Sequence, residues 1–315
     1  GDETSWLLLR WQEGARFPLT LCRYDNNRGK GAASNTGLSL VRGRYTVLMD
    51  SDNELFEDAV EKIVDCIRTS GIDDIDELAG MYFRYVDQRD EVIGDFPNRD
   101  VRDMFRRGDG MIRAAGNEAR YRLGLSFEQM PVMKSSVLRE YPFIEFTDSE
   151  HSQEAITLGK IHNDHDVIHV DHVVGRYYAH DDMERLSNGD PGALNWPRAN
   201  YLWSVQVLNQ DMQYARHDPG FFISRARKVT RLGLHIGRPL SRQWSDLAHT
   251  KARILWLVAF LGGGLLGYFR DRLLGKSVPR ADADIAKWGP AVPPQNLEIH
   301  PSHLEMPNQR VIPPH

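Results

Sequence analysis

The first 170 residues alternate between apolar patterns of helical period and short apolar runs of strand character. Residues 3–13, 57–68 and 149–161 carry apolar side chains at helical spacing. The runs at residues 19–24, 45–49, 80–87 and 167–170 are typical of strands, and the alternation in residues 80–87 predicts a half-buried strand. Residues 91–129 lose this regularity and are rich in Arg, Asp and Gly.

The most informative stretch is residues 25–55. Gly29, Lys30 and Gly31 are expected to form a small cationic loop, and residues 32–41 a helix with small side chains on one side. The strand that follows ends abruptly in Asp50 and Asp52. Alone, Gly-Lys-Gly is usually a turn and Asp-Ser-Asp a solvated loop, but their order around a helix and a strand is less often accidental.

This order suits a diphosphate ligand. Glycines let backbone amides approach phosphate oxygens, and the N-terminus of the following helix adds partial positive charge. Arg28 and Lys30 can neutralise the remaining phosphate charge. Carboxylates at the end of a strand, such as Asp50 and Asp52, can hold Mg²⁺ or Mn²⁺ that bridges to phosphate.

The same residues resemble family 2 glycosyltransferases with the GT-A fold. The resemblance rests on Asn-Arg-Gly-Lys-Gly-Ala-Ala at residues 27–33, Arg-Gly-Arg-Tyr at 42–45 and Met-Asp-Ser-Asp at 49–52, and it covers roughly residues 1–180. The Gly-Lys-Gly variant is similar to transferases acting on polyprenyl phosphate or cell-surface polysaccharide. Many members carry Ala-Arg-Asn on the helix, whereas this chain has Ser34 in place of that arginine.

The resemblance implies an α/β fold of the GT-A kind, with a mixed sheet covered by helices on both faces. It also implies metal-dependent, inverting transfer of a sugar from a nucleoside diphosphate sugar to a glycan or a polyprenyl phosphate. Asp50 and Asp52 would bind the metal, and the catalytic base would be Asp148, with Glu150 as second choice. The expected donor-binding residues are Arg28, Gly29, Lys30, Asn35, Asp50 and Ser51.

Residues 1–4 resemble the end of the loop that follows the second strand of this family. The first strand, its helix and a uracil-binding aspartate are therefore expected before residue 1. We interpret the chain as N-terminally truncated on this basis.

Two polar clusters leave alternatives open. The arginines of residues 91–129 predict a solvated surface, or less often a loop that meets an anionic lipid phosphate or acidic sugar. His162, His165, His169 and His172, interleaved with aspartates, could form a transition-metal site, but a solvent-facing edge is the favoured interpretation. His180 could reach the metal or diphosphate.

The C-terminal half predicts membrane attachment. After a transferase domain at residues 1–185, residues 186–250 form a basic helical extension, 251–275 an apolar helix and 276–315 a Pro-rich tail. About 16 uncharged residues at 254–269 would span ~24 Å, short of a ~30 Å bilayer core. Basic residues flank this run on both sides, which favours an interfacial or short spanning helix on the cytoplasmic face of a membrane.

Composition adds limits. A net charge of −5 gives no overall basic field for nucleic acid, and the two cysteines, Cys22 and Cys66, indicate a reducing compartment. Two rival functions remain: a nucleotidyltransferase, in which Asp148 would be dispensable, and a non-catalytic, membrane-anchored scaffold with a degenerate transferase fold.

Overall fold

The computed structural model describes residues 3–94, 99–125, 127–146, 154–178, 194 and 196–276, and the backbone of 297–300. Its centre is a six-stranded mixed sheet in the order β2-β6-β4-β7-β3, with β5 paired to β7. β4 and β7 run parallel, and the other pairs are antiparallel. The strands are β2 (Tyr45–Val47), β3 (Glu54–Leu55), β4 (Leu78–Val86), β5 (Met111–Ala115), β6 (Gln129–Lys134) and β7 (Asp166–Arg176).

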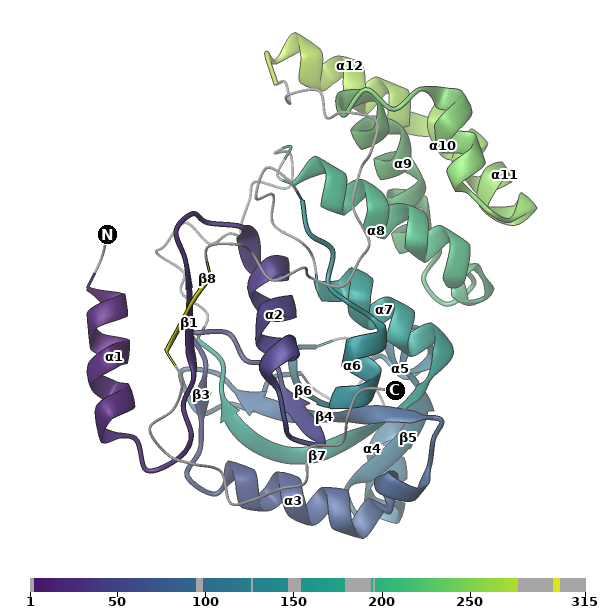
Figure 1. Cartoon of the computed structure of the whole chain (residues 1–315). Helices are drawn as coiled ribbons and strands as arrows, with labels where there is room; N and C mark the ends of the chain where they lie inside the picture. Colours follow the sequence, from purple (N-terminus) through teal and green to yellow (C-terminus); the bar gives the residue numbers. More distant parts are fainter. Residues whose placement is uncertain are drawn as a thin grey trace.

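Helices cover both faces of this sheet, as expected for an α/β fold of the GT-A kind (Figure 1). On one face Met81, Phe83 and Tyr85 of β4 pack against α3 (Ala59–Ser70). On the other face, Tyr82 and its neighbours pack against three further helices. These are α2 (Gly29–Leu40), α6 (Ser135–Glu140) and α7 (Glu154–Asp164).

The prediction of a half-buried strand at residues 80–87 is wrong in one respect. All nine residues of β4 are buried, because the strand is central and both of its faces are covered. The buried Arg84 caused the error, because a charged residue between apolar ones imitates the alternation of a solvent-facing strand.

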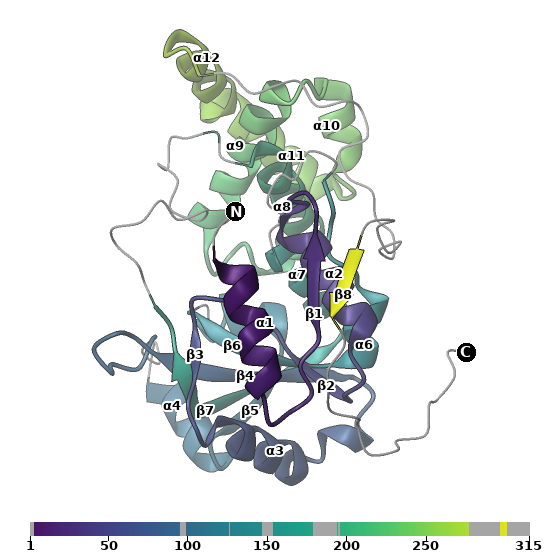
Figure 2. The same ribbon diagram turned by 60° about the vertical axis from the view of Figure 1, so that its left-hand side comes forward.

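The cationic Gly-Lys-Gly segment is not a separate loop. α2 begins at Gly29, so Lys30 lies in the first turn of that helix, and the left-handed backbone of Gly29 (φ 80°) makes the entry. Ahead of it are α1 (Thr4–Gly14) and β1 (Leu21–Tyr24), which pairs antiparallel with the backbone of β8 (Leu297–His300). Figures 1 and 2 show these elements beside the sheet.

The irregular stretch 91–129 folds into elements that its pattern does not predict. α4 (Arg99–Arg107) leads into β5, and α5 (Gly116–Tyr121) follows directly. These elements enclose a small core of their own around Phe105 and Ile112. The high charge of α4 masks two buried positions, Val101 and Phe105, at helical spacing.

The C-terminal helices form a second packed cluster. They are α8 (Pro197–Gln210), α9 (Pro219–His235), α10 (Leu240–Asp246), α11 (Thr250–Ala259) and α12 (Leu265–Leu273). Short helical turns lie at Ile72–Asp74, Met212–Tyr214 and Phe260–Gly264. Tyr201, Phe222 and Trp256 lie in the core of this cluster. Figures 1 and 2 show it above the helical face of the sheet that carries α7.

Candidate active site

Lys30 connects three elements at one edge of the sheet. Its ammonium group contacts the Asp50 carboxylate in the turn after β2 and lies 2.8 Å from Glu154 Oε1 at the start of α7. Partial burial alone would lower the pKa of Lys30, but Glu154 and Asp50 outweigh it, and the pKa is raised. Lys30 therefore stays charged, between two carboxylates that come from distant parts of the sequence.

Asn35 and Arg28 both contact the segment that ends at Phe146. Asn35 is buried; its amide nitrogen donates to the Phe143 carbonyl and to Glu145 Oε1, each at 2.9 Å. The Phe143 amide donates back to Asn35 Oδ1 at 2.8 Å. Arg28 Nη2 lies 3.0 Å from Glu145 Oε2. Asn35 thus fixes the segment before α7, while Glu145 holds Arg28 beside the N-terminus of α2.

An open groove runs past this helix N-terminus. Its volume is about 820 Å³, and Tyr24, Asn27, Arg28, Gly29 and Lys30 are among its lining residues. The Arg28 guanidinium lies over the Tyr24 ring, 5.3 Å from its centroid. The groove thus joins a flat aromatic surface to a cationic helix N-terminus, a combination that fits an anionic ligand.

The residues of the Asp-Ser-Asp turn, Asp50, Ser51 and Asp52, are all exposed. Burial raises the pKa of Tyr85, and the charges of Asp50, Glu128, Glu154 and Asp52 raise it further. Acidic side chains from the turn after β2, from α7 and from the segment before β6 thus gather around the end of β4.

Among the described residues, no group of three His, Cys, Asp or Glu side chains is arranged to hold a metal ion. A Mg²⁺ or Mn²⁺ ion that takes most of its ligands from phosphate and water needs only one or two carboxylates from the protein. Asp50 and Asp52 fit a metal that arrives with its ligand, and they do not form a closed protein cage.

A cavity of about 290 Å³ starts at Glu154 and extends between the sheet and α8. Its wall includes Tyr82, Phe127, Gln129, His169 and Trp203. The cavity therefore shares the Glu154 carboxylate with the cluster of Lys30, Asp50 and Glu154, called the Lys30 cluster below. Aromatic rings beside polar groups are a suitable lining for a hydroxyl-rich ligand.

The histidines of the predicted cluster separate into different environments. His169 is 4% exposed, so a solvent-facing edge is wrong for this residue. Its ring stacks on Tyr82, whose hydroxyl lies 2.7 Å from His162 Nε2, and its Nδ1 lies 3.1 Å from Gln129 Oε1. Burial lowers the pKa of His162 to about 4 and that of His169 to about 3. His172, in contrast, is exposed.

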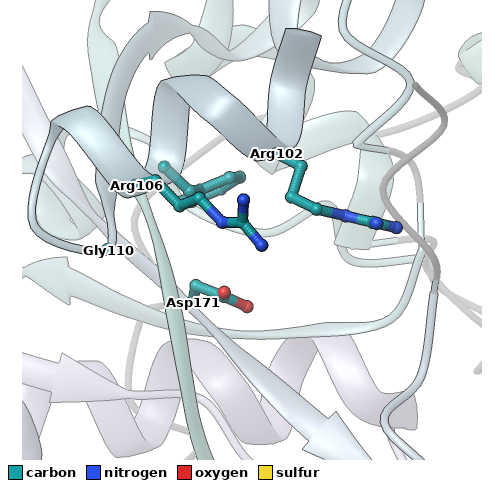
Figure 3. A pocket seen from close by; sticks show the side chains of 5 residues that line it. Arg102, Arg106, Gly110 and Asp171 are labelled. Atoms are coloured by element: carbon teal, nitrogen blue, oxygen red, sulfur yellow. The ribbon is translucent and has the colours of Figure 1, made fainter. Parts of the chain in front are cut away.

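A second, shallower cavity of about 510 Å³ lies over α4 and β7. Arg102 and Arg106 extend from one helix, and the Arg106 guanidinium lies near Asp171 (Figure 3). Asp171 accepts a 2.7 Å hydrogen bond from Arg84 Nη1, and the Arg84 guanidinium lies 5.3 Å from the centroid of Phe127. Arg84 therefore stands between the two cavities.

Three predicted site residues lie outside the described residues: Asp148, Glu150 and His180. Sequence reasoning missed Glu154, a few residues further on, and the acidic position at the start of a helix was the available signal. It also missed Glu145 and the Tyr82–His169 wall, because only the folded chain brings these residues to Lys30 or to the cavity.

The geometry agrees with the comparison with known families. Residues 2–90 match the family model described as Glycosyl transferase family 2. The match covers Lys30, Asp50 and Asp52, and it confirms the predicted resemblance for this segment. Sugar transfer is the general activity that it supports.

The other comparisons add little. No curated protein matches the sequence. One similar solved structure is the crystal structure of S. aureus TarS 1–349, with 13% identity over 88% of this chain and 71% of that chain. Its TM-score of 0.41 is too low to carry an argument.

Proposed function

We propose that the protein transfers a sugar from a nucleoside diphosphate sugar to the hydroxyl or phosphate oxygen of an acceptor. The observation that carries the proposal is the position of Lys30, which lies within the matched family segment between Asp50 and Glu154. Glu154 in turn lines the cavity beneath α8. One cation there can meet the donor diphosphate, while one carboxylate faces the acceptor.

The donor diphosphate would bind at the N-terminus of α2. Lys30 and Arg28 supply charge, and the first backbone amides of the helix supply hydrogen bonds. The nucleoside would lie along the groove beside Tyr24. Asp50 and Asp52 would hold Mg²⁺ or Mn²⁺, which stabilises the negative charge of the leaving diphosphate.

Glu154 is our candidate for the catalytic base, together with Asp148 and Glu150. Its carboxylate would accept the proton of the acceptor hydroxyl while the oxygen bonds to the anomeric carbon. The bond from that carbon to the diphosphate oxygen breaks, and the nucleoside diphosphate leaves with the electron pair. Attack opposite the leaving group inverts the anomeric centre. The 2.8 Å contact with Lys30 supports this role, because donor phosphate would draw Lys30 away and release the carboxylate.

The acceptor would enter through the cavity beneath α8. Trp203 and Phe127 offer flat surfaces for sugar rings, and Gln129 offers an amide. Beyond Phe127, the pair Arg102 and Arg106 favours an acceptor with a phosphate or another oxyanion. A glycan bearing phosphate and a polyprenyl phosphate both have this chemistry.

The test is product release from UDP-, GDP- and dTDP-sugars, each with Mn²⁺, by the wild-type protein and by Glu154→Gln. We expect one donor class to be hydrolysed slowly or transferred, and Glu154→Gln to lower kcat by about 10²–10⁴-fold without weakening donor binding. Glu61→Gln, an exposed position on α3, is the matched control. Asp148→Asn and Glu150→Gln, measured in parallel, decide which of the three carboxylates is the base.

The rival functions give different results. A nucleotidyltransferase would release pyrophosphate from a nucleoside triphosphate, and a scaffold would bind none of these nucleotides. Either outcome with a folded protein would overturn the proposal.

A further inference from the structure

The helices α11 and α12 present an apolar ridge on the side that faces away from α9. Its members lie at helical spacing, and their side chains are 52–88% exposed. They are Ile254, Val258, Leu261, Leu266, Phe269 and Leu273. Exposed apolar side chains in this number along one side of two helices are characteristic of a site that binds a lipid surface or a partner.

The opposite side of the same helices is fixed to α9. Trp256 belongs to the core of the C-terminal cluster, and a Cβ on Gly264 would come within 2.8 Å of Thr230. Asp271 is fully buried and accepts hydrogen bonds from Arg231 at 2.5 and 3.0 Å. The exposure of the ridge is thus set by packing along both helices.

A bend makes this segment unsuitable as a single spanning rod. Residues Thr250–Leu273 are long and apolar enough to cross a bilayer by length and composition. However, Gly263 has a non-helical backbone (φ 139°, ψ −11°) inside the π-helical turn between α11 and α12. α11 has 10 residues and α12 has 9, so each is about 15 Å or less, half of a ~30 Å bilayer core.

The charge around the ridge selects between partners. Lys251, Arg270 and Arg272 are exposed, whereas Asp271, the one acidic residue of the segment from Thr250 to Lys276, is buried. All exposed charge on this segment is therefore positive. Anionic lipid headgroups complement it, whereas a second copy of the same surface would bring like charges together.

We propose that α11 and α12 lie in the plane of an anionic lipid surface, with the ridge inserted among the acyl chains and the flanking cations at the headgroups. This attachment is independent of sugar transfer. It would hold the cavity beneath α8 close to a membrane without a spanning segment in this part of the chain.

Flotation with lipid vesicles tests the proposal. The full chain is expected to float with vesicles of phosphatidylcholine and phosphatidylglycerol, and much less with phosphatidylcholine alone. The double variant Leu261→Ser/Leu266→Ser should bind these anionic vesicles at least about tenfold more weakly. Arg270→Gln and Arg272→Gln should each weaken the binding about fivefold. Val60→Ser, which is 64% exposed on α3, is the matched control and should float like wild type.

Depth measurements separate an in-plane from a spanning arrangement. In a Cys22→Ser background, Leu261→Cys and Leu273→Cys each carry a polarity-sensitive dye. If the helices lie in the plane of the membrane, the dyes should report the same, shallow depth at both positions. A spanning helix would instead place Leu261 near the bilayer centre and Leu273 near its surface.

Three results would overturn the proposal: no flotation with anionic vesicles, flotation unchanged in Leu261→Ser/Leu266→Ser, or a dimer in solution that this double variant dissociates. Flotation is measured without any nucleotide sugar, so its failure is distinct from a failure of the proposed enzymatic activity.

Discussion

At the scale of single residues, the site depends on polar side chains whose partners come from distant sequence. Lys30 meets Asp50 and Glu154, and Asn35 meets Phe143 and Glu145. Both lysine contacts are partly exposed, so they add little stability and are free to exchange for a ligand. The Asn35 contacts are buried, so we expect them to stay in place when a donor binds, in contrast to the donor-binding role that the sequence predicts for Asn35.

Asn35→Ala tests this division. The variant leaves the Phe143 amide and carbonyl without their side-chain partner and should lower the free energy of unfolding by about 1–3 kcal/mol. Donor affinity measured below the unfolding transition should change less than threefold. Ser34→Ala, on the neighbouring position of α2, is the control for stability. A large loss of donor affinity with unchanged stability would show that Asn35 contacts the donor directly.

The cavity wall predicts a dependence of stability on pH. The pKa values of His162 (about 4) and His169 (about 3) lie below the value of about 6.5 that both adopt in the unfolded chain. The stability they contribute is complete above pH 6.5. It falls as the pH drops towards 4, because only the unfolded chain then binds the protons.

Urea unfolding between pH 7 and pH 4 measures this effect. His169→Gln should flatten the loss of stability over that range, whereas His249→Gln, at an exposed position, should leave the slope unchanged. An unchanged slope in His169→Gln would mean that the histidine is not buried as a neutral ring.

At the scale of elements, the close approach of β4 and β6 predicts contrasting effects of two glycine substitutions. A Cβ on Gly80 would lie 2.5 Å from the Val132 carbonyl oxygen and 2.7 Å from the Met133 Cα. Gly80→Ala should therefore lower the free energy of unfolding by about 1–3 kcal/mol. Gly37 is exposed in α2, and a Cβ there would have no neighbour within 4 Å. Gly37→Ala should therefore raise the free energy of unfolding by about 0.5–1 kcal/mol. Equal shifts in urea midpoint would contradict this packing.

The buried pair of Asp271 and Arg231 predicts a strong coupling between α12 and α9. Burial would raise the pKa of Asp271, but Arg231 and His235 outweigh it and the pKa is lowered. Asp271→Asn should cost about 3–5 kcal/mol, because it leaves Arg231 with an unbalanced charge. The double variant Arg231→Met/Asp271→Leu should recover most of this loss. If the losses of Arg231→Met and Asp271→Leu, each measured alone, add up to the loss of the double variant, the two side chains do not interact.

Most elements with a clear period could be predicted, and the reasons for the exceptions are physical. The helix at 57–68 and the strand at 45–49 appear in the structure as α3 and β2, displaced by at most two residues at each end. α4 and β5 could not be predicted, because their arginines and glycines obscure two short amphipathic faces. The break at Gly263 was not predicted either, although three successive glycines mark a weak point in a helix.

At the scale of the whole molecule, three regions follow one another. The groove at α2 lies next to the Lys30 cluster, Glu154 leads from that cluster into the cavity beneath α8, and the C-terminal helices lie beyond it (Figure 1). The sequence predicted Lys30, Asp50 and Asp52 as site residues, and the structure brings Lys30 to Asp50; their roles toward donor and metal stay predictions. The cavity beneath α8 could not be predicted, because its walls come from β4, β7, α5 and α8 and carry no local motif.

The most direct test of the central claim is calorimetric titration of nucleoside diphosphate sugars into the protein with and without Mn²⁺. Wild type should bind one donor class only with metal. In Asp52→Asn, Mn²⁺ should no longer promote binding. Lys30→Met should weaken binding about tenfold or more, as expected for a charge-assisted hydrogen bond. Arg68→Ala, an exposed cation on α3, should bind like wild type. If Lys30→Met and Asp52→Asn both bind the donor as tightly as wild type does, the nucleotide sugar binds elsewhere and the central claim is wrong.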